Sequence, residues 1–404
     1  MAYESLRSIY YKNPDKYQAE YDKRFSAPFT KHFDIMIHQF NHRKFYPAFI
    51  CYTEEMLLVM EDITRENENL NRLLVKMPDI GVQQFAYSTM INEIVSTNQI
   101  EGIHSTRKEI TTALKKQYET KSITRFWSVV NKYQKIIKGE EIDFTSSQAV
   151  RNFYDEFILD EVVKLESDNR PDGKIFRKDS VSIGAGKDIH RGLYPEAEII
   201  KAMDTALNIL NDTTVPYLIR VAVFHYLFGY IHPFYDGNGR TSRFITSYYL
   251  SKKINLLASL RISVNIKGHR EKYYSLFEES NSELNCGDLS LFVIEFLHLI
   301  LATVVDVQET IKTKLDKLDK YEKILNKKLD EAKIEDVLTR KIYSLLLHSL
   351  LFSPYGFTVE EIVAKTGKSR NTIDNRLNKI SSEHIIKDTD TRPYRYRLNA
   401  MMLK

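Results

Sequence analysis

The segment HPFYDGNGRTSR, residues 232–243, brings together residues that can act on a phosphate-containing group. His232 titrates near neutral pH, so its imidazole can take a proton from a hydroxyl. Asp236 supplies a hard oxygen ligand, which suits a Mg²⁺ ion that bridges phosphates. A base and a metal ligand four residues apart therefore predict chemistry at a phosphate rather than a simple turn.

The second half of this segment predicts a helix start that binds an anion. The apolar run 218–231 is expected to form a buried helix, and helical spacing resumes at Gly239. Glycines at 237 and 239 let an anion approach the free N–H groups of a helix start. Arg240 and Arg243 are three residues apart and can point the same way, which suits a polyphosphate. The combination indicates transfer of a phosphate-containing group from a nucleotide to a hydroxyl.

This segment resembles the signature of the Fic (filamentation induced by cAMP) family, HxFx[DE]GNGRxxR, at every defined position. Most characterised members of that family transfer AMP from ATP to a protein hydroxyl. The resemblance implies a Mg²⁺-dependent protein adenylyltransferase whose acceptor is a Tyr, Ser or Thr hydroxyl on a target protein or on itself. By position it implies His232 as catalytic base, Asp236 as metal ligand, and an ATP-binding set of Asp236, Gly237, Asn238, Gly239, Arg240, Thr241, Ser242 and Arg243.

A second segment, STNQIEG, resembles the inhibitory motif [ST]xxxE[GN] of the same family, with matches at Thr97, Glu101 and Gly102. The glycine is expected to end a helix over 82–101, which puts Glu101 in the last turn. The helix dipole disfavours an anion there by about 0.3–1 kcal/mol, so a cationic partner is expected. The resemblance implies that this partner is Arg243 and that the pair autoinhibits the enzyme and contacts ATP. In some relatives the matching glutamate positions a water that removes AMP, so removal stays an alternative activity.

Residues 269–288 resemble the family segment that builds the adenine pocket. The resemblance implies ATP contacts from Tyr273, Tyr274 and Asn281. Adjacent tyrosines also occur often in protein cores, and the sequence alone leaves both interpretations open.

The stretch 170–188 interrupts the helical pattern with Pro-Asp-Gly and two later glycines, and predicts a β-hairpin. The resemblance implies that this hairpin is the family's flap. An exposed strand edge there can pair with an extended segment of a target protein. Ile183 and Gly184 are the flap residues expected near the nucleotide.

Composition places the chain among ordinary globular proteins. Its 404 residues include 14 glycines and 10 prolines, and long stretches follow helical spacing, so we expect a mostly α fold. A net charge of +4 is too small to indicate a nucleic-acid or membrane partner by itself. The two cysteines, Cys51 and Cys286, predict neither a disulfide framework nor a cysteine metal site, and favour the reducing cytoplasm. No apolar run reaches the roughly 18 residues needed to span a bilayer, so no membrane partner is expected.

Four regions are predicted along the chain, namely an N-terminal helical region (1–80), a Fic core with its inhibitory helix and β-hairpin flap (81–300), a long connecting helix (301–334) and a winged helix-turn-helix (335–404). The connecting helix is expected because leucines and isoleucines form an apolar stripe in a charged segment.

The winged helix-turn-helix is predicted from the pattern of 356–399. Val359 to Lys365 would be the first helix, Ser369 would cap a second helix, and alternating apolar residues with Arg392, Arg395 and Arg397 would form the wing. Residues 335–404 hold twelve Lys/Arg against eight Asp/Glu, which permits DNA binding without a strong basic patch. Protein docking or a homodimer contact is the alternative use of such a module. A nucleotide-sensing, DNA-binding regulator is accordingly the second functional hypothesis.

Overall fold

The computed structural model describes residues 3–115, 124–183, 190–389 and 393–404. The described chain divides into two compact units. Unit 1 comprises residues 1–67, 93–105 and 128–304, and unit 2 comprises 68–92, 106–127 and 305–404. Two residues named in the sequence predictions, Gly184 of the flap and Arg392 of the wing, lie outside the described residues.

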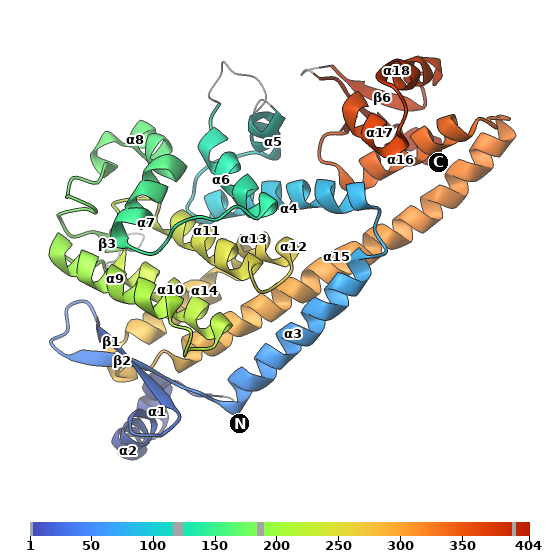
Figure 1. Ribbon diagram of the computed structural model, residues 1–404. Coiled ribbons are helices and arrows are strands. Elements are labelled where there is room, and N and C mark those ends of the chain that lie inside the picture. Colours follow the sequence, from blue (N-terminus) through green and yellow to red (C-terminus); the bar gives the residue numbers. More distant parts are fainter. Residues whose placement is uncertain (1–2, 116–123, 184–189, 390–392) are drawn as a thin grey trace. The chain divides into compact units, whose positions relative to one another are not determined.

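The described part of the chain is mostly helical, as predicted (Figure 1). The α-helices are α1 Leu6–Lys12, α2 Pro14–Phe25, α3 Glu54–Leu74, α4 Asp79–Ile100, α5 Arg107–Lys115, α6 Trp127–Lys138, α7 Ser147–Tyr154, α8 Asp160–Leu165, α9 Glu196–Asn211, α10 Tyr217–Ile231, α11 Asn238–Ser251, α12 Leu256–Ser259, α13 Ile262–Gly268, α14 Arg270–Asn281, α15 Ser290–Glu331, α16 Val337–Phe352, α17 Val359–Thr366 and α18 Arg370–Lys379. A π-turn, η2 Asp155–Leu159, joins α7 to α8, and short 3₁₀ turns are η3 Ser167–Asn169, η4 Glu283–Asn285 and η5 Ala400–Leu403.

Strands are short and form three small antiparallel sheets. The strands are β1 Thr30–His38, β2 Phe45–Cys51, β3 Ser182–Ile183, β4 His190–Arg191, β5 Phe357–Thr358, β6 Ile385–Asp388 and β7 Arg395–Leu398. The β3–β4 pair forms a small hairpin on the helical body, as predicted, but β4 lies just beyond the stretch 170–188 from which the hairpin was predicted.

Helices α10 and α11 form the centre of unit 1. Helix α10 is apolar all round because the core surrounds it, and eleven of its fifteen residues are buried. Helix α11 follows after a six-residue loop and is also buried along most of its length. In Figure 1 these two helices lie among α9, α13 and α14. The loop between them carries the motif, so a rigid core holds both of its ends.

The N-terminal region departs from its prediction, because 1–80 is not only helical. Strands β1 and β2 pair antiparallel, from Thr30 with Cys51 to His38 with Phe45, with a bulge between His32 and Met36. Every second residue of β1 from Phe33 to Ile37 is buried, which is the two-residue period of a half-buried strand. The predicted helical region thus omitted this sheet. Its second strand contains a proline, a residue that occurs in edge strands.

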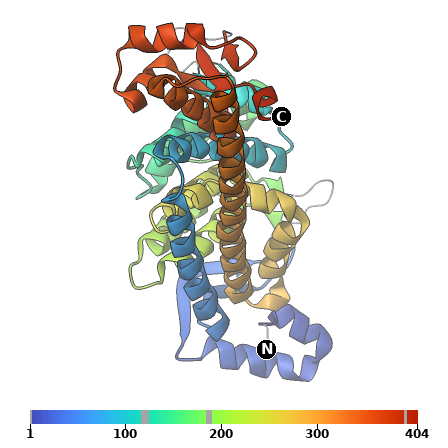
Figure 2. The ribbon, with the colours of Figure 1, turned by 90° about the vertical axis from the view of Figure 1, so that its right-hand side faces the viewer.

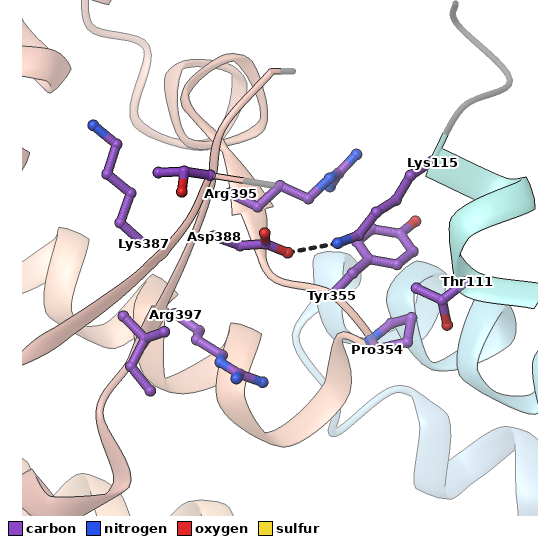
Figure 3. Close-up of a pocket in the computed structure, with 10 residues that line it drawn as sticks. Thr111, Lys115, Pro354, Tyr355, Lys387, Asp388, Arg395 and Arg397 are labelled. Carbon is purple, nitrogen blue, oxygen red and sulfur yellow. Dashed lines mark hydrogen bonds and ion pairs between the residues drawn. The ribbon is translucent and has the colours of Figure 1, made fainter. Parts of the chain in front are cut away.

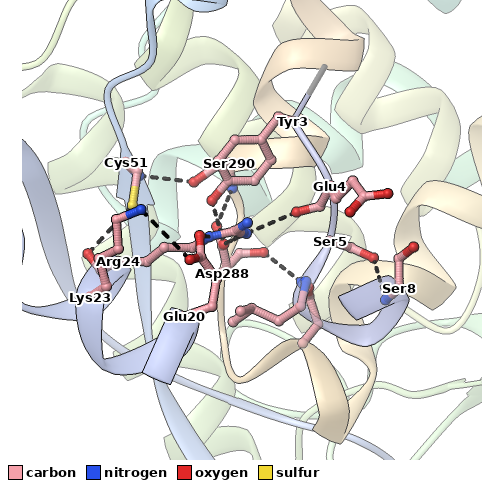
Figure 4. A network of polar contacts seen from close by, with 12 residues as sticks. Tyr3, Glu4, Ser5, Ser8, Glu20, Lys23, Arg24, Cys51, Asp288 and Ser290 are labelled. Carbon is pink, nitrogen blue, oxygen red and sulfur yellow. Dashed lines mark hydrogen bonds and ion pairs between the residues drawn. The ribbon is translucent and has the colours of Figure 1, made fainter. Parts of the chain in front are cut away.

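A buried polar network ties the N-terminus to the start of α15 (Figure 4). Arg24 Nη1 donates to the Glu4 carbonyl at 2.8 Å and to Asp288 Oδ2 at 3.2 Å. The Tyr3 hydroxyl donates to the same Asp288 oxygen at 2.6 Å, and the Arg24 guanidinium lies 4.3 Å from the Tyr3 ring centroid. Asp288 Oδ1 accepts from the Ser290 N–H at 2.9 Å. The buried carboxylate is therefore fully paired, as a buried charge must be.

Helix α15 is longer than predicted, since it begins at Ser290 rather than near residue 301 and runs for 42 residues. The predicted break does not exist because the apolar run before residue 305 continues the helical spacing of the charged stretch after it. Within unit 1, α3 and α15 lie side by side in both views (Figures 1 and 2), and His298 Nε2 is 3.2 Å from Glu55 Oε1.

Among the described residues, α15 is the single helix that passes the length and composition test for a membrane span. Of its most apolar 18-residue window, 56% is buried inside the protein. The core helix of a soluble protein passes the same test, so one such helix is weak support for a span.

Unit 2 contains the elements predicted for the C-terminal module. Helix α17 has a capping box between Thr358 and Glu361 and ends at Gly367, whose φ is +68°. Ser369 caps α18, as predicted, by accepting from the Thr372 N–H. The three strands follow the order β5-β7-β6. Arg395 lies in the wing strand β7, as predicted, but it is buried and its Nη1 donates to the Gly356 carbonyl at 3.1 Å.

A cavity of about 410 Å³ lies beside this sheet (Figure 3). Lys115 of α5 reaches into it and pairs with Asp388 at 2.5 Å. Arg395 stacks over Tyr355 at 4.3 Å from the ring centroid, and the exposed Arg397 also lines the cavity. The lining is thus mixed in charge, with lysine and arginine prominent.

Candidate active site

His232 ends α10 in a strained backbone conformation. Its φ is +52°, in the left-handed region that residues other than glycine rarely adopt. Its N–H still donates to the Phe228 carbonyl at 3.0 Å, and its Nδ1 lies 3.3 Å from the Gly229 carbonyl. Because a carbonyl only accepts, Nδ1 must carry the proton in this arrangement, which leaves Nε2 as the acceptor.

The surroundings of His232 keep the ring neutral. Burial lowers its pKa to about 3, and interactions with His190 and with the Arg177 guanidinium act in the same direction. The Gly229 hydrogen bond and the Glu101 carboxylate oppose this shift but do not overcome it. At neutral pH the ring is therefore an unprotonated base.

The loop after His232 is closed by Asn238. Its Oδ1 accepts from the Phe234 N–H at 2.9 Å, and its Nδ2 donates to the Phe234 carbonyl at 2.7 Å. The Phe234 ring is fully buried and stacks on Tyr154 with centroids 3.6 Å apart. The Tyr154 hydroxyl donates to the Asp236 carbonyl at 3.0 Å. Asn238, predicted as an ATP contact, thus uses its side chain to hold the loop and offers its backbone N–H to the site.

Gly237 precedes α11 with φ +80°, so a residue with a side chain would be strained there. A Cβ at this position would also press on the Tyr154 ring at 3.3 Å. The following N–H groups belong to the first turn of α11, where no earlier carbonyl of the helix can accept from them. The turn therefore has the free N–H groups at a helix start that the glycine spacing predicted, and an anion could accept from them.

Arg240 is buried and lies between two carboxylates. Its Nη1 is 3.3 Å from Glu161 Oε1, and its Nη2 is 3.4 Å from Asp236 Oδ2. Glu161 comes from α8, 79 residues earlier, and sequence reasoning missed it because no motif links the two positions. The guanidinium is 1% exposed, so its charge acts with little solvent screening.

Arg243 is held by the segment predicted to restrain it. Its Nε donates to Thr97 Oγ1 at 2.8 Å and its Nη2 to the Thr97 carbonyl at 3.2 Å. Nη2 also donates to Glu101 Oε1 at 2.6 Å, and the arginine side chain is 1% exposed. A Cβ on Gly239 would overlap Glu101 Oε1, so the glycine is needed for this approach. The predicted Glu101–Arg243 ion pair is therefore present.

Helix α4 ends one residue earlier than predicted, at Ile100, and Glu101 follows in a turn. The Ile103 N–H donates to the Asn98 carbonyl at 2.9 Å and the Gly102 N–H to the Gln99 carbonyl at 3.2 Å, with Gly102 at φ +73°. These two bonds form a Schellman motif. They use the carbonyls of the last turn and turn the chain so that the carboxylate of Glu101 faces α11.

The carboxylate of Glu101 stays ionised. Burial acts to raise its pKa, but the charge and hydrogen bond of Arg243 and the charge of Arg240 hold it below its usual range. The side chain remains 25% exposed, so it lies at the boundary between the core and the site.

Thr241 and Ser242 point away from the anion-binding turn. The Thr241 hydroxyl donates to the Gly237 carbonyl at 2.9 Å, and the Ser242 hydroxyl lies 3.2 Å from His225 Nδ1. Both side chains are buried. The Thr241 N–H also donates to the Gly237 carbonyl, at 3.0 Å. The structure therefore does not bring the predicted Thr241 and Ser242 side chains to the turn.

The predicted adenine residues differ in accessibility. Tyr274 is exposed on α14, with the Arg270 guanidinium 5.6 Å from its ring centroid. The Tyr273 hydroxyl is 2.8 Å from His225 Nε2, while Asn281 is buried and its Oδ1 accepts from Tyr226. Tyr274 is therefore the member of this set whose ring is exposed and could face an adenine base.

On the flap, Ile183 pairs with His190 in the β3–β4 ladder, and Gly184 lies outside the described residues. Arg177 precedes this hairpin and is fully buried, with its Nε donating to the His232 carbonyl at 2.9 Å. Sequence reasoning missed Arg177 because its partners are backbone carbonyls, which leave no pattern in the sequence.

Asp236 is placed to bind a cation together with a phosphate-containing ligand at the first turn of α11. Its Oδ1 accepts from the Gly237 N–H at 2.5 Å, and its side chain is 34% exposed beside the first turn of α11. No group of three or more His, Cys, Asp or Glu side chains suited to a metal occurs among the described residues. A single carboxylate next to an anion site is the donor set that Mg²⁺ uses when phosphates complete its shell.

Comparison with known proteins identifies the domain that carries this site. The family model described as Fic/DOC family matches residues 144–250. The chain is 31% identical over 122 residues to the protein adenylyltransferase Fic of Drosophila melanogaster, and 30% identical over 122 residues to that of Drosophila yakuba. Each match covers 30% of this chain, but only 23% and 22% of those relatives.

A crystal structure of a Fic family protein from Desulfovibrio desulfuricans G20 has a similar fold, with a TM-score of 0.50 at 19% identity. The match covers 86% of this chain and 97% of that one. The motif loop of α10–α11 lies inside the region that the family model matches. The chain therefore carries a Fic/DOC-family domain, over residues 144–250.

Proposed function

We propose that this chain is a protein adenylyltransferase that transfers AMP from ATP to a hydroxyl of a target protein or of itself. The observation that carries the proposal is the position of His232, a neutral base at the start of a loop that leads directly into the anion-binding turn of α11. The Drosophila relatives that the domain resembles are named protein adenylyltransferases. Their names describe those proteins, and this chain spans less than a quarter of their length.

In the proposed reaction, His232 Nε2 takes the proton from the acceptor hydroxyl. The hydroxyl oxygen forms a bond to the α-phosphorus of ATP, the bond from that phosphorus to the bridging oxygen breaks, and pyrophosphate leaves. The N–H groups of the α11 turn and the Arg240 guanidinium stabilise the charge on the phosphates. Arg243 reaches the γ-phosphate only when it is released from Glu101.

Asp236 would hold a Mg²⁺ ion together with the phosphates, where the ion supplies charge neutralisation during phosphate transfer. Asp236 also accepts from Arg240 at 3.4 Å, so binding of a cation would free that guanidinium for the nucleotide. Binding of the cation by Asp236 and release of Arg240 toward the nucleotide would therefore occur together.

Target proteins are proposed to dock along the flap. Strand β3 is two residues long and pairs with β4 on one side, so its other edge can take an added strand. An extended target segment there would bring a Tyr, Ser or Thr hydroxyl toward His232. We also expect the protein to act in the cytoplasm, where its two buried cysteines stay reduced.

Removal of AMP is a second candidate, favoured by the position of Glu101. Its ionised carboxylate lies beside the anion-binding turn and its charge also acts on His232. An ionised carboxylate there can orient a water for attack on a phosphodiester. The same residue would then restrain transfer and assist removal.

The test is self-labelling with ATP labelled at the α-phosphate. We expect label in Glu101→Gly, less in the wild type, and none in the double variant that adds His232→Ala. The His232→Ala variant should still bind ATP. Binding of ATP without label in Glu101→Gly, with or without Mg²⁺, would favour a nucleotide sensor over an enzyme.

DNA is a candidate partner of the C-terminal module, since α18 carries two arginines on a capped helix. Both are engaged, Arg370 Nη1 with Glu360 at 2.5 Å and Arg376 Nη2 with Asp336 at 3.2 Å, so DNA would have to displace those carboxylates. Arg397 in the wing is exposed and lies beside the cavity of Figure 3. A shift of duplex DNA at low salt that is lost in Arg376→Ala would support DNA binding, and the absence of a shift would favour protein docking or a homodimer contact.

A further inference from the structure

Arg177 is among the largest side chains of the described chain that are fully buried. It lies in the irregular segment between η3 and β3, close in sequence to the flap. A buried guanidinium is costly unless its donors are satisfied. Here the partners found in the described part of the chain are backbone carbonyls rather than a carboxylate. The position of those carbonyls shows which part of the backbone Arg177 holds.

Three of the carbonyls belong to the end of α10 and to the loop 232–237 that follows it. Arg177 Nε donates to the His232 carbonyl at 2.9 Å, and Nη2 donates to the Ile231 carbonyl at 3.4 Å. Nη1 donates to the Asp179 carbonyl, and the Arg177 N–H donates to the Pro233 carbonyl at 3.3 Å. The residue thus binds three successive carbonyls, 231 to 233, on both sides of the base.

We propose that Arg177 is a positioning residue that fixes the backbone of His232, and through it the imidazole, while joining this backbone to the base of the flap. The left-handed φ of +52° at His232 is a conformation that costs free energy and persists only when its surroundings impose it. Arg177 helps to impose this conformation through its hydrogen bond to the His232 carbonyl. Gly192, next to β4, completes them, because an added Cβ there would overlap Arg177 Nη2 and lie 3.0 Å from His232 Cβ.

The charge of Arg177 has a separate effect on the same ring. A cation nearby disfavours the imidazolium, so Arg177 acts with burial to lower the pKa of His232. His190 on β4 acts in the same direction, and Glu101 from the turn after α4 opposes it. Burial lowers the pKa of Arg177 itself to about 10, so it stays charged at neutral pH.

A purely structural cap of α10 is the simpler role for a cation at the end of a helix. Such a cap would change stability without changing the ring. The catalytic part of the proposed role rests on the proposed adenylyltransferase function, whereas the orientation and protonation of the ring do not. The two parts can therefore be tested separately.

The first experiment uses ¹⁵N-histidine NMR of the full chain, with His232→Ala to assign the ring. In Arg177→Met, which removes charge and donors, the pKa of His232 should rise above its wild-type value and the Nδ1–H tautomer should lose its dominance. Arg177→Lys keeps the charge, so it should change the tautomer but not the pKa. Arg24→Lys is the control, since Arg24 is a buried arginine of the N-terminal network away from this site.

The second experiment measures self-labelling in the Glu101→Gly background. Arg177→Lys and Gly192→Ala should both lower kcat by about 100-fold, because a small displacement of a catalytic group has effects of this size. Their KM for ATP should stay within about twofold, since no ATP contact is removed. Arg24→Lys should leave both constants unchanged.

Unchanged tautomer and pKa of His232 in Arg177→Met would overturn the proposal, as would wild-type kcat in Arg177→Lys with only a lower melting temperature. If Arg177→Met does not fold, Arg177→Lys and Gly192→Ala decide the matter by the tautomer of the ring. If the Glu101→Gly parent transfers no AMP, the proposed function fails, and the NMR experiment still tests the position of His232.

Discussion

Glu101 Oε1 lies 2.6 Å from Arg243 Nη2 and fills the space that a side chain at Gly239 would need. The Glu101 carboxylate therefore both binds the Arg243 guanidinium and lies against the backbone of the first turn of α11 at Gly239. A triphosphate and this carboxylate cannot hold the same guanidinium in the same way, and their like charges repel each other.

Releasing this contact should activate transfer. We expect Glu101→Gly to raise self-labelling by about 10-fold to 100-fold, the range of a coupling of 1–3 kcal/mol. Glu101→Gln should activate less, because it removes the charge but can still accept a hydrogen bond from Arg243. The rate of label incorporation at saturating ATP measures both effects. Glu166→Gly, at the exposed C-cap of α8, is the control; equal labelling by wild type and Glu101→Gly would show that the ion pair does not restrain transfer.

The low pKa of His232 sets the pH dependence that we expect for the proposed transfer. Because burial lowers this pKa from 6.5 to about 3, the ring stays neutral as the pH falls through its ordinary value. For Glu101→Gly we expect no loss of kcat/KM between pH 8 and pH 5 from protonation of His232. The profile is measured with self-labelling at constant ionic strength. A fall that follows a single pKa near 6.5 would mean that the ring is more exposed to water than its burial indicates.

The same shift has a consequence for stability. The folded pKa is lower than the unfolded one, so the unfolded chain binds more protons as the pH drops below about 6.5. The contribution of His232 to the free energy of unfolding is therefore fully present above pH 6.5 and is lost progressively toward pH 3. The loss should be smaller in His232→Gln, which cannot titrate.

Removal of divalent ions should stop the proposed transfer. Because Asp236 lies beside the first turn of α11 and is 34% exposed, we expect EDTA to abolish self-labelling of Glu101→Gly and added Mg²⁺ to restore it. Asp236→Asn should need a higher Mg²⁺ concentration for half-maximal rate, because a neutral amide binds the ion less strongly. Asp172→Asn offers a matched control on the loop before β3, where its Oδ1 accepts from Tyr235. The same Mg²⁺ requirement in Asp236→Asn and in its parent would exclude Asp236 as the ligand.

Glu93 gives a prediction about stability alone. It is fully buried on α4, and both of its oxygens accept from the Ser263 N–H, at 3.0 and 2.9 Å. Burial raises its pKa to about 7, against the hydrogen bonds and the charge of Arg243. A carboxyl with a raised folded pKa binds more protons in the native state, so stability declines as the pH rises from about 4.5 to about 7.

Replacing this carboxyl by an amide should remove that decline. We expect Glu93→Gln to be more stable than the wild type at pH 8, by an amount on the order of 1–3 kcal/mol, and similar to it at pH 5. Thermal unfolding at the two pH values gives the comparison. Equal stability differences at pH 5 and pH 8 would show that Glu93 does not titrate in this range.

How far the sequence predicted these features depends on how local their causes are. The α10–loop–α11 segment could be predicted because apolar spacing, glycines and arginines all lie within about 26 consecutive residues. The Glu101–Arg243 pair joins residues 142 apart, and it was expected from the family resemblance and the glycine that ends α4. Glu161 and Arg177 were missed because their roles arise from tertiary contacts, one with an arginine on another helix and one with carbonyls.

The fold shows the same division between local and long-range causes. Helices α17 and α18 follow from their capping residues, Thr358 and Ser369, which are visible in the sequence. The β1–β2 pair depends on packing of Phe33 and Ile35 against the core, and its partner strand contains Pro47, so local propensity argued against it.

Phe234 supplies a final test, because its ring anchors the loop 232–237 between α10 and α11. It is fully buried, stacks on Tyr154 at 3.6 Å and meets the edge of Phe176 at 5.4 Å. Phe234→Ala should lower the free energy of unfolding by about 3–5 kcal/mol, the usual cost of emptying a buried aromatic site. Urea unfolding measures the change, and Phe29→Ala is the control because Phe29 is 53% exposed.

The loss should reach the chemistry as well, since the loop that Phe234 anchors holds both His232 and the N–H groups of α11. Phe234→Leu fills part of the site, so it should recover more stability than activity, because a branched chain cannot stack on Tyr154. Label incorporation in the Glu101→Gly background, measured at a temperature where the variant is folded, separates the two. Full activity in a destabilised but folded Phe234→Leu variant would mean that Asn238, with its two bonds to the Phe234 backbone, is sufficient to hold the loop.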